Sequence, residues 1–164
     1  MKIKHLLAGA IMCLGLSAFA DGYTDGIDYY KAGQYGNART LLNRNLNSAG
    51  DAQALVHYYL GQIDLIDCNK AEAKANFAKG IKIDPNNAYN YVGLGALALL
   101  NGNDKQADEY FNQALKVGKK NNEITVDIAR AYFNADPVKY AKDVTKYLDQ
   151  AHKDSKHNEP SIYI

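Results

Sequence analysis

Small and aromatic residues recur along this chain at a fixed long interval. Three such markers in the middle of the sequence return after 34 residues, the distance from Gly61 to Gly95. The markers and their copies are Leu60-Gly61 with Leu94-Gly95, Ala73 with Ala107, and Phe77 with Phe111. Weaker copies lie upstream around Gly26 and Ala38 and downstream around Ala129 and Ala141. A shared spacing of this length indicates repeated supersecondary units.

The polar and apolar pattern inside each unit predicts two helices separated by a turn, and no strand-like alternation competes with it. Gly33 and Gly102 each follow the first helix of a unit, where a left-handed residue commonly ends a helix. Asp136-Pro137 predicts an N-cap and the first position of a helix, and Asp104 predicts another N-cap. The expected helices are at about 23–32, 35–47, 52–66, 70–82, 88–101, 104–117, 122–134 and 137–156.

The repeated residues resemble the tetratricopeptide repeat (TPR) family, whose 34-residue unit carries small residues where its helices touch. The second and third units match most closely, through Gly61, Ala73, Phe77 and Pro85 and through their copies. The resemblance implies an all-α, right-handed superhelical solenoid of about four helix-turn-helix repeats. The expected repeats are 21–53, 54–87, 88–121 and 122–160, and together they make one domain.

Small residues at the helix crossings have a physical role, because a bulky side chain there would push the helix backbones apart. Repeat four departs from the pattern, since Ala151 and Pro160 are more widely spaced than in the other units. We therefore expect its second helix to be about one turn longer. That helix has no partner after it, and an apolar tail, residues 161–164, resembles the start of a further, truncated repeat. We expect an uncapped end there.

The first twenty residues are typical of a bacterial secretory signal peptide. Lys2 and Lys4 precede an apolar stretch, and Ala18-Phe19-Ala20 offers small residues for cleavage after Ala20. The apolar stretch is too short to span a bilayer. We expect an exported, periplasmic protein. Acylation of Cys13 is disfavoured because Met12, a large residue, precedes it.

Composition and charge exclude some partners. The chain is 47% hydrophobic, which suits a folded domain, and its net charge is +1. Removing Lys2 and Lys4 leaves 17 basic and 18 acidic residues, a net charge of −1. Such a near-neutral chain gives no electrostatic reason to expect binding to nucleic acid or to an anionic membrane.

No catalytic constellation, metal site or cofactor site emerges from the residues, so we expect no enzymatic activity. His57 occupies a core position of its repeat, and Asp64 and Asp67 are expected on a solvated helix face. Tyr29, Tyr91 and Tyr132 are expected in the core. Cys68 is the only thiol beyond the signal peptide and falls in a turn, so no disulfide within the mature chain is expected.

The resemblance also implies a concave groove lined by the first helix of each repeat. The residues carried over to the groove are mostly apolar or aromatic, Leu100 among them. The polar exceptions include Gln62, Glu123 and Arg130. Exposed apolar surface of this kind marks interaction sites. The residues expected to make the principal partner contacts are Tyr30, Tyr58, Leu65, Tyr89, Leu99 and Phe133.

The sequence therefore favours a non-enzymatic scaffold that binds a partner peptide or helix in this groove. The alternative is a structural role, as the N-terminal arm of a larger envelope protein or as a self-associating solenoid. The identity of the partner does not follow from the residues.

Overall fold

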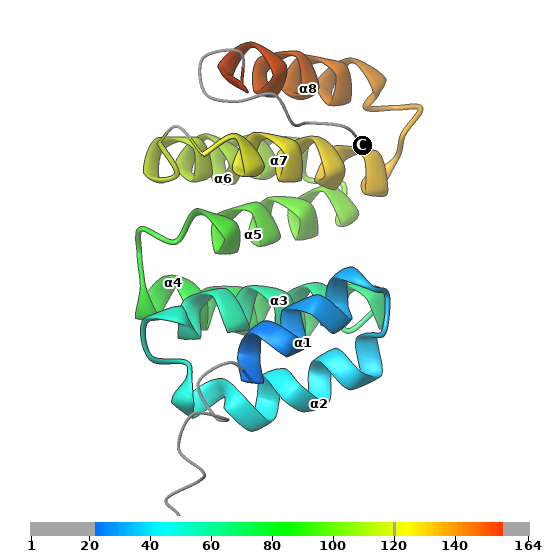
Figure 1. Cartoon of the computed structure of the whole chain (residues 1–164). Coiled ribbons are helices and arrows are strands. Elements are labelled where there is room, and N and C mark those ends of the chain that lie inside the picture. Colours follow the sequence, from blue (N-terminus) through cyan, green and yellow to red (C-terminus); the bar gives the residue numbers. More distant parts are fainter. Residues whose placement is uncertain (1–21, 120, 156–164) are drawn as a thin grey trace, which may run out of the picture.

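The computed structural model describes residues 22–119 and 121–155, and they form an all-α solenoid. Antiparallel helices pair within each repeat and the pairs stack on one another, from α1 and α2 at one end to α8 at the other (Figure 1). The helices are α1 (Gly22–Lys31), α2 (Tyr35–Asn45), α3 (Gln53–Ile66), α4 (Lys70–Ile83), α5 (Ala88–Leu100), α6 (Asp104–Val117), α7 (Asn122–Ala135) and α8 (Ala141–Ser155). Two short 3-10 helices, Leu46–Ser48 and Gly50–Ala52, join α2 to α3.

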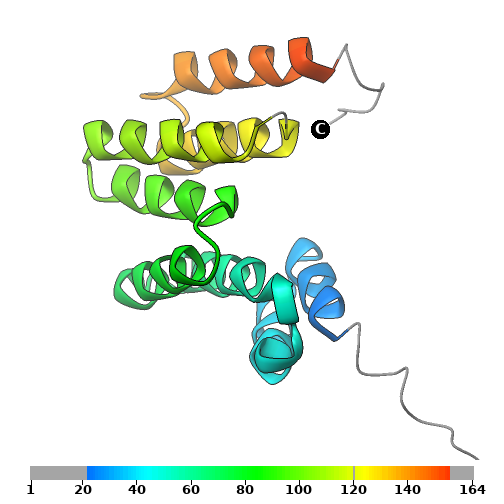
Figure 2. The same ribbon diagram turned by 90° about the vertical axis from the view of Figure 1, so that its left-hand side faces the viewer.

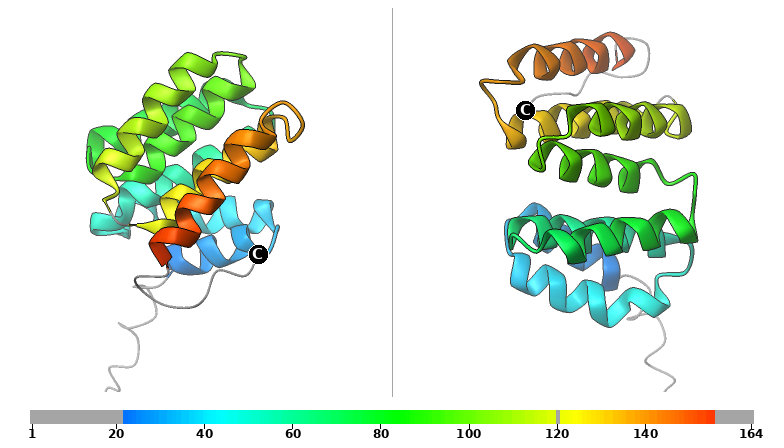
Figure 3. Two further views of the ribbon diagram at one scale, coloured as in Figure 1. Left: turned by 90° about the horizontal axis from the view of Figure 1, so that it is seen from above. Right: turned by 180° about the vertical axis from the view of Figure 1, so that it is seen from behind.

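The stack twists along its length. In the side view of Figure 2 the first pair, in blue and cyan, is seen nearly along its axes, whereas α6 and α8 are seen from the side. The view from above in Figure 3 shows the same rotation between the first pair and α8. The first helices α1, α3, α5 and α7 contact one another in turn, so they form one continuous inner face.

Glycine and phenylalanine set the distance between helices, as the repeat spacing predicts. The ring of Phe77 on α4 is fully buried, and a Cβ on Gly61 or Gly93 would lie 2.5 or 2.3 Å from it. Phe111 on α6 lies against Gly95 in the same way, because a Cβ on Gly95 would be 2.3 Å from its ring. These approaches require glycine because any side chain would overlap the ring.

The turns between paired helices use left-handed residues at equivalent repeat positions. Gly33 and Gly102 have φ angles of 73° and 71°, which confirms the sequence prediction. The equivalent residue between α3 and α4 is Cys68, with a φ of 61°. A non-glycine residue there is strained, because its Cβ approaches the backbone closely.

Repeat four differs from the prediction at its turn. α8 begins at Ala141 and not at residue 137, because residues 137–140 form a separate turn. Asp136 still caps this turn by accepting the backbone N–H groups of Val138 and Lys139. The described part of α8 has 15 residues against 14 in α6, so it is no full turn longer, and the wide spacing from Ala151 to Pro160 extends beyond the described residues. The cap of α6 is also shifted, since the side chain of Asn103, not Asp104, accepts the N–H of Gln106.

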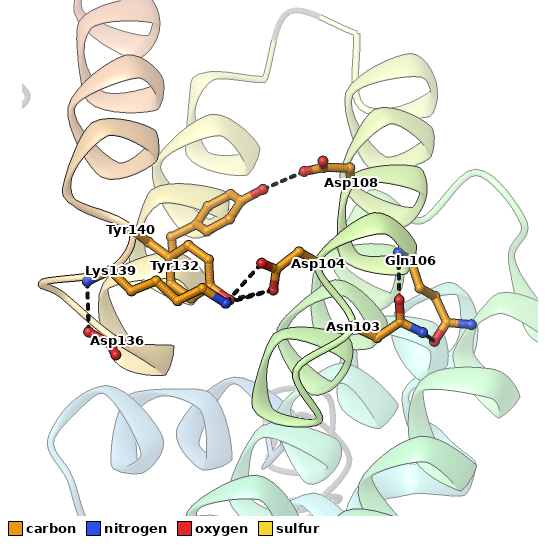
Figure 4. Close-up of polar contacts among 8 residues, drawn as sticks. All are labelled: Asn103, Asp104, Gln106, Asp108, Tyr132, Asp136, Lys139 and Tyr140. Carbon is orange, nitrogen blue, oxygen red and sulfur yellow. Dashed lines mark hydrogen bonds and ion pairs between the residues drawn. The ribbon is translucent and has the colours of Figure 1, made fainter.

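Polar contacts hold repeat four against repeat three (Figure 4). The Lys139 ammonium lies 2.8 Å from a carboxylate oxygen of Asp104, and the Tyr140 hydroxyl donates to the same carboxylate. The Tyr132 hydroxyl donates to Asp108 at 2.6 Å. All three contacts run from the last repeat to α6, so they supplement the apolar packing at that end of the solenoid.

The exposed side of α8 is polar within the described residues. The buried positions of α8 are Tyr147 and Ala151, while its exposed positions are mostly Lys, Thr, Asp, Gln and His. A polar outer face is what a terminal helix of a solenoid needs for solubility. The predicted signal peptide, residues 1–20, and the tail, residues 161–164, lie outside the described residues.

Asp64 also differs from expectation, because it is buried and not solvated. It is 2% exposed, and its carboxylate accepts from Arg39 at 2.7 Å and from Asn76 at 2.7 Å. Asn76 in turn contacts Nδ1 of His57, which is buried as predicted. This polar network joins α2, α3 and α4, and Asp67, the more exposed carboxylate, binds the other Nη atom of Arg39. Tyr29 also differs from the prediction of a core position, because it is 37% exposed. Tyr132 is buried, as predicted.

The ion pair at Asp64 generates a stability prediction. Replacing Arg39→Met leaves a buried carboxylate without its cation, so the free energy of unfolding should fall by about 2–3 kcal/mol. The control Arg44→Met, on an exposed position of the same helix, should change it by no more than about 0.5 kcal/mol. Urea denaturation followed by circular dichroism measures both. Equal stability of the two variants would contradict the importance of the pair.

The glycine contacts generate a second prediction. Gly95→Val should lower the free energy of unfolding by about 2–3 kcal/mol, because its side chain overlaps the ring of Phe111. In the Gly95→Val background, Phe111→Leu should lower the free energy of unfolding by less than it does in the unchanged protein, since the smaller side chain relieves the overlap. Gly36→Val is the control, because a Cβ at Gly36 meets nothing within 4 Å. Additive effects in this double-mutant cycle would contradict the packing account.

Candidate functional site

A cleft of about 1110 Å³ lies along the inner face of the solenoid. We call it the concave cleft. Its lining comes almost entirely from the first helices of the four repeats, with one residue from the start of α2 and one from the end of α8. The lining residues are Tyr30, Lys31, Tyr35, Tyr58, Tyr59, Gln62, Leu65, Ile66, Tyr89, Val92, Ala96, Leu100, Asn122, Glu123, Val126, Asp127, Arg130, Ala131, Asn134, Ala135 and Ser155.

Five tyrosines form one side of the concave cleft, which we call the tyrosine wall. They touch in the order Tyr35, Tyr30, Tyr59, Tyr58 and Tyr89, with ring centroids 5.6, 5.1, 5.1 and 5.3 Å apart. Interplanar angles between 43° and 67° show that the rings are tilted against one another and are not stacked. The wall therefore presents both ring faces and ring edges to the cleft.

The tyrosine wall is partly withdrawn from water. Burial raises the pKa of Tyr30 and of Tyr59 to about 12, and it also raises the pKa of the buried Tyr58 well above its usual value. The Asp127 carboxylate adds to the rise at all three by opposing a phenolate. The rings therefore remain neutral and face a negative charge across the cleft.

Helix α7 supplies the opposite side, which we call the α7 wall, and it carries charges. The Tyr89 hydroxyl donates to Glu123 at 2.6 Å, which joins α5 to α7. Asp127 pairs with Arg130 on the same helix; the Asp127 side chain is 13% exposed and that of Arg130 is 63% exposed. Burial raises the pKa of Asp127, whereas Arg130 and a hydrogen bond from Tyr58 act in the opposite direction.

The C-terminal ends of the first helices bring aliphatic side chains to one end of the concave cleft, beside Lys31 and Asn134. Leu65 and Ile66 end α3, Leu100 ends α5, and Ala135 ends α7. Ile66 and Leu100 are 44% and 40% exposed, which is high for large aliphatic side chains. The cleft is thus divided into an aromatic and charged part and an aliphatic part.

The structure brings four of the six predicted contact residues into the concave cleft and leaves two out. Leu99 is a core residue, only 4% exposed, and its neighbour Leu100 takes the lining position. Phe133 is 55% exposed but does not line the cleft, whereas Asn134 does. The residues that do line it are Tyr30, Tyr58, Leu65 and Tyr89. Their role in binding stays a prediction.

Tyr59 and Asp127 line the cleft but were not expected there. They occupy the same position of their repeats, since Tyr59, Gly93 and Asp127 follow one another at intervals of 34 residues. In repeat three, Gly93 packs on Phe77, so this position belongs to the core there. The repeat spacing, applied to this position in the other units, could have identified both residues.

The described residues contain no group of three or more His, Cys, Asp or Glu side chains placed to hold a metal ion. Cys68 is exposed in the α3–α4 turn and is not among the lining residues of the cleft. No helix within residues 22–119 and 121–155 has the length and apolar character needed to cross a membrane.

The raised tyrosine pKa values generate a prediction for alkaline pH. A phenol whose pKa is about 10 in the unfolded chain and about 12 in the folded chain stabilises the fold below pH 10. This contribution is lost as the pH rises from about 10 to about 12, because the unfolded chain ionises first. Tyr59→Phe removes one ionising group, so its unfolding midpoint should move to higher pH. An unchanged midpoint, measured by circular dichroism, would contradict the buried state of Tyr59.

Comparison with solved structures supports the fold. A structure described as "Crystal structure of MamA" matches with a TM-score of 0.55 and 18% identity, and the match covers 85% of this chain and 80% of that chain. A second, "Crystal structure of MamA protein", matches with a TM-score of 0.55 and 17% identity over 90% of this chain and 80% of that chain. MamA is a TPR-like helical protein.

Searches by sequence add nothing to this likeness: no protein-family model and no curated protein matches the chain. At the identities given above, the structural matches bear on the fold alone. The chain is therefore similar to TPR-like solenoids in the arrangement of its helices.

Proposed function

We propose that the protein is a non-enzymatic scaffold that binds a segment of a partner protein in the concave cleft. The observation that carries this proposal is the cleft itself, which combines half-buried tyrosines with the exposed aliphatic residues Ile66 and Leu100 along consecutive first helices. Its volume of about 1110 Å³ exceeds the usual range of small-molecule pockets, about 300–1,000 Å³. An extended or helical peptide is a ligand of suitable size.

The chemistry of the lining also supports a binding role. Tyrosine is enriched at protein interfaces because it is rigid and combines an apolar ring with a polar tip. The charged groups of the α7 wall, Glu123 bonded to Tyr89 and Asp127 paired with Arg130, add polar contacts to the apolar lining. The similarity to MamA supports a scaffold at the level of fold.

The pattern of residues 1–20 supports export, with cleavage after Ala20 and a periplasmic location. The mature chain would then meet its partner in the cell envelope. A self-associating solenoid is less well supported, because the exposed face of α8 is polar and offers little apolar surface for a second copy.

A blocking substitution tests the proposal. Ala96 lines the cleft on α5 and is half-buried, so Ala96→Arg places a long charged side chain in the cleft without removing a core group. Ala75→Arg is the matched control, because Ala75 is exposed on α4 and does not line the cleft. Residues 21–164 with each change would serve as bait in a cross-linked envelope extract.

We expect a partner to be recovered by the unchanged protein and by Ala75→Arg, and its recovery with Ala96→Arg to fall at least about tenfold, a loss of about 1.4 kcal/mol. Circular dichroism and thermal unfolding verify that both variants are folded. Recovery of the same partner by both variants in equal amounts would place binding outside the cleft.

A further inference from the structure

The tyrosine wall has the geometry of a cation site. Tyr30, Tyr59, Tyr58 and Tyr89 lie in successive contact with tilted rings, and all four line the concave cleft. The face of an aromatic ring is negative, and it attracts an ammonium or guanidinium group placed within about 6 Å of its centroid. Several such faces around one space favour a cation over a neutral group.

A carboxylate faces these rings from the other side of the cleft. Asp127 on α7 hydrogen-bonds with the Tyr58 hydroxyl, and its charge acts on Tyr30 and Tyr59 as well. Its side chain is only 13% exposed, so the charge is poorly screened by water. An ordered carboxylate beside several aromatic rings is a complete set of groups for binding an organic cation.

The chain's own Arg130 is the cation on Asp127 in this structure. The two residues are three apart on α7, and the Arg130 side chain is 63% exposed. The Arg130 side chain is mostly solvated, so it can leave Asp127 without becoming a buried, unpaired cation. A cation delivered by a bound ligand could therefore replace Arg130, which would remain in water.

The aliphatic end of the cleft restricts the kind of ligand further. Leu65, Ile66 and Leu100 lie on the same lining surface as the tyrosines, so one ligand can contact both parts. A free amine would use only the aromatic part. A peptide that carries a basic side chain beside aliphatic side chains would use both.

From these contacts we infer that the concave cleft selects partner segments with a lysine or arginine, whose cation binds Asp127 and the half-buried rings of Tyr30 and Tyr59 in place of Arg130. This inference rests on the proposed function, because it names the chemistry of the partner for the same cleft. Charge complementarity is the basis of the selection, and the aliphatic residues supply the remaining contact area.

The test uses pools of short, capped and fluorescently labelled peptides. Each pool has one fixed central residue, lysine, norleucine or glutamate, among randomised leucine, tyrosine and serine. Norleucine matches lysine in its aliphatic stem and lacks the ammonium group. Binding to the mature chain is measured by fluorescence anisotropy at low and at high salt. The variants are Asp127→Asn, Arg130→Gln and, as a control with the same charge change on the exposed face of α8, Asp149→Asn.

We expect the lysine pool to bind about tenfold more tightly than the norleucine pool at low salt, and less so at high salt. Asp127→Asn should abolish this preference, whereas Asp149→Asn should retain it. Arg130→Gln should strengthen binding of the lysine pool about twofold, because the internal competitor is gone.

Two results would overturn the inference while leaving the proposed function intact: equal binding of all three pools, or a lysine preference that survives in Asp127→Asn. Tighter binding of the glutamate pool that is lost in Arg130→Gln would show instead that Arg130 anchors an acidic partner. Binding of no pool at all would count against the proposed function itself, so the two failures are distinguishable.

Discussion

The packing of a buried phenylalanine against glycine in repeats two and three is the contact on which the rest of this structure depends. Phe77 lies against Gly61 of its own repeat and Gly93 of the next, and Phe111 lies against Gly95. Because no side chain separates the helices at these points, the first helices stand close enough to form one continuous inner face. The concave cleft is the space in front of that face, so its shape follows from these contacts.

The repeat also explains why the cleft is not uniform. One position of the unit is occupied by Tyr59, Gly93 and Asp127 in three successive repeats. In repeat three the glycine serves packing on Phe77, while in the flanking repeats the tyrosine and the carboxylate line the cleft. Residues that follow the period build the solenoid, and residues that break it on the inner face give the cleft its aromatic and charged character.

The helices could be predicted from the sequence to within a few residues, because a 34-residue period repeats the same local signals several times. Interactions between distant residues could not. Asp64 looked like a surface carboxylate because nothing in its own helix reveals Arg39, which is 25 residues earlier in the chain.

The same limit affects the cleft. Leu99 and Leu100 differ by one position on α5, yet one is in the core and the other lines the cleft. A repeat pattern transferred from a family does not determine the rotation of a helix about its axis to within one residue. The contact between Tyr58 and Asp127 depends on how repeats two and four face each other, which only the assembled superhelix shows.

The central claim is that partners bind on the inner face, and site-specific photo-cross-linking tests it most directly. A benzophenone amino acid would replace Gln62, which lines the cleft on α3, or Lys79, which is exposed on α4. After irradiation of living cells, the account predicts a cross-linked partner from position 62 and none from position 79. A partner cross-linked from position 79 and not from position 62 would contradict it.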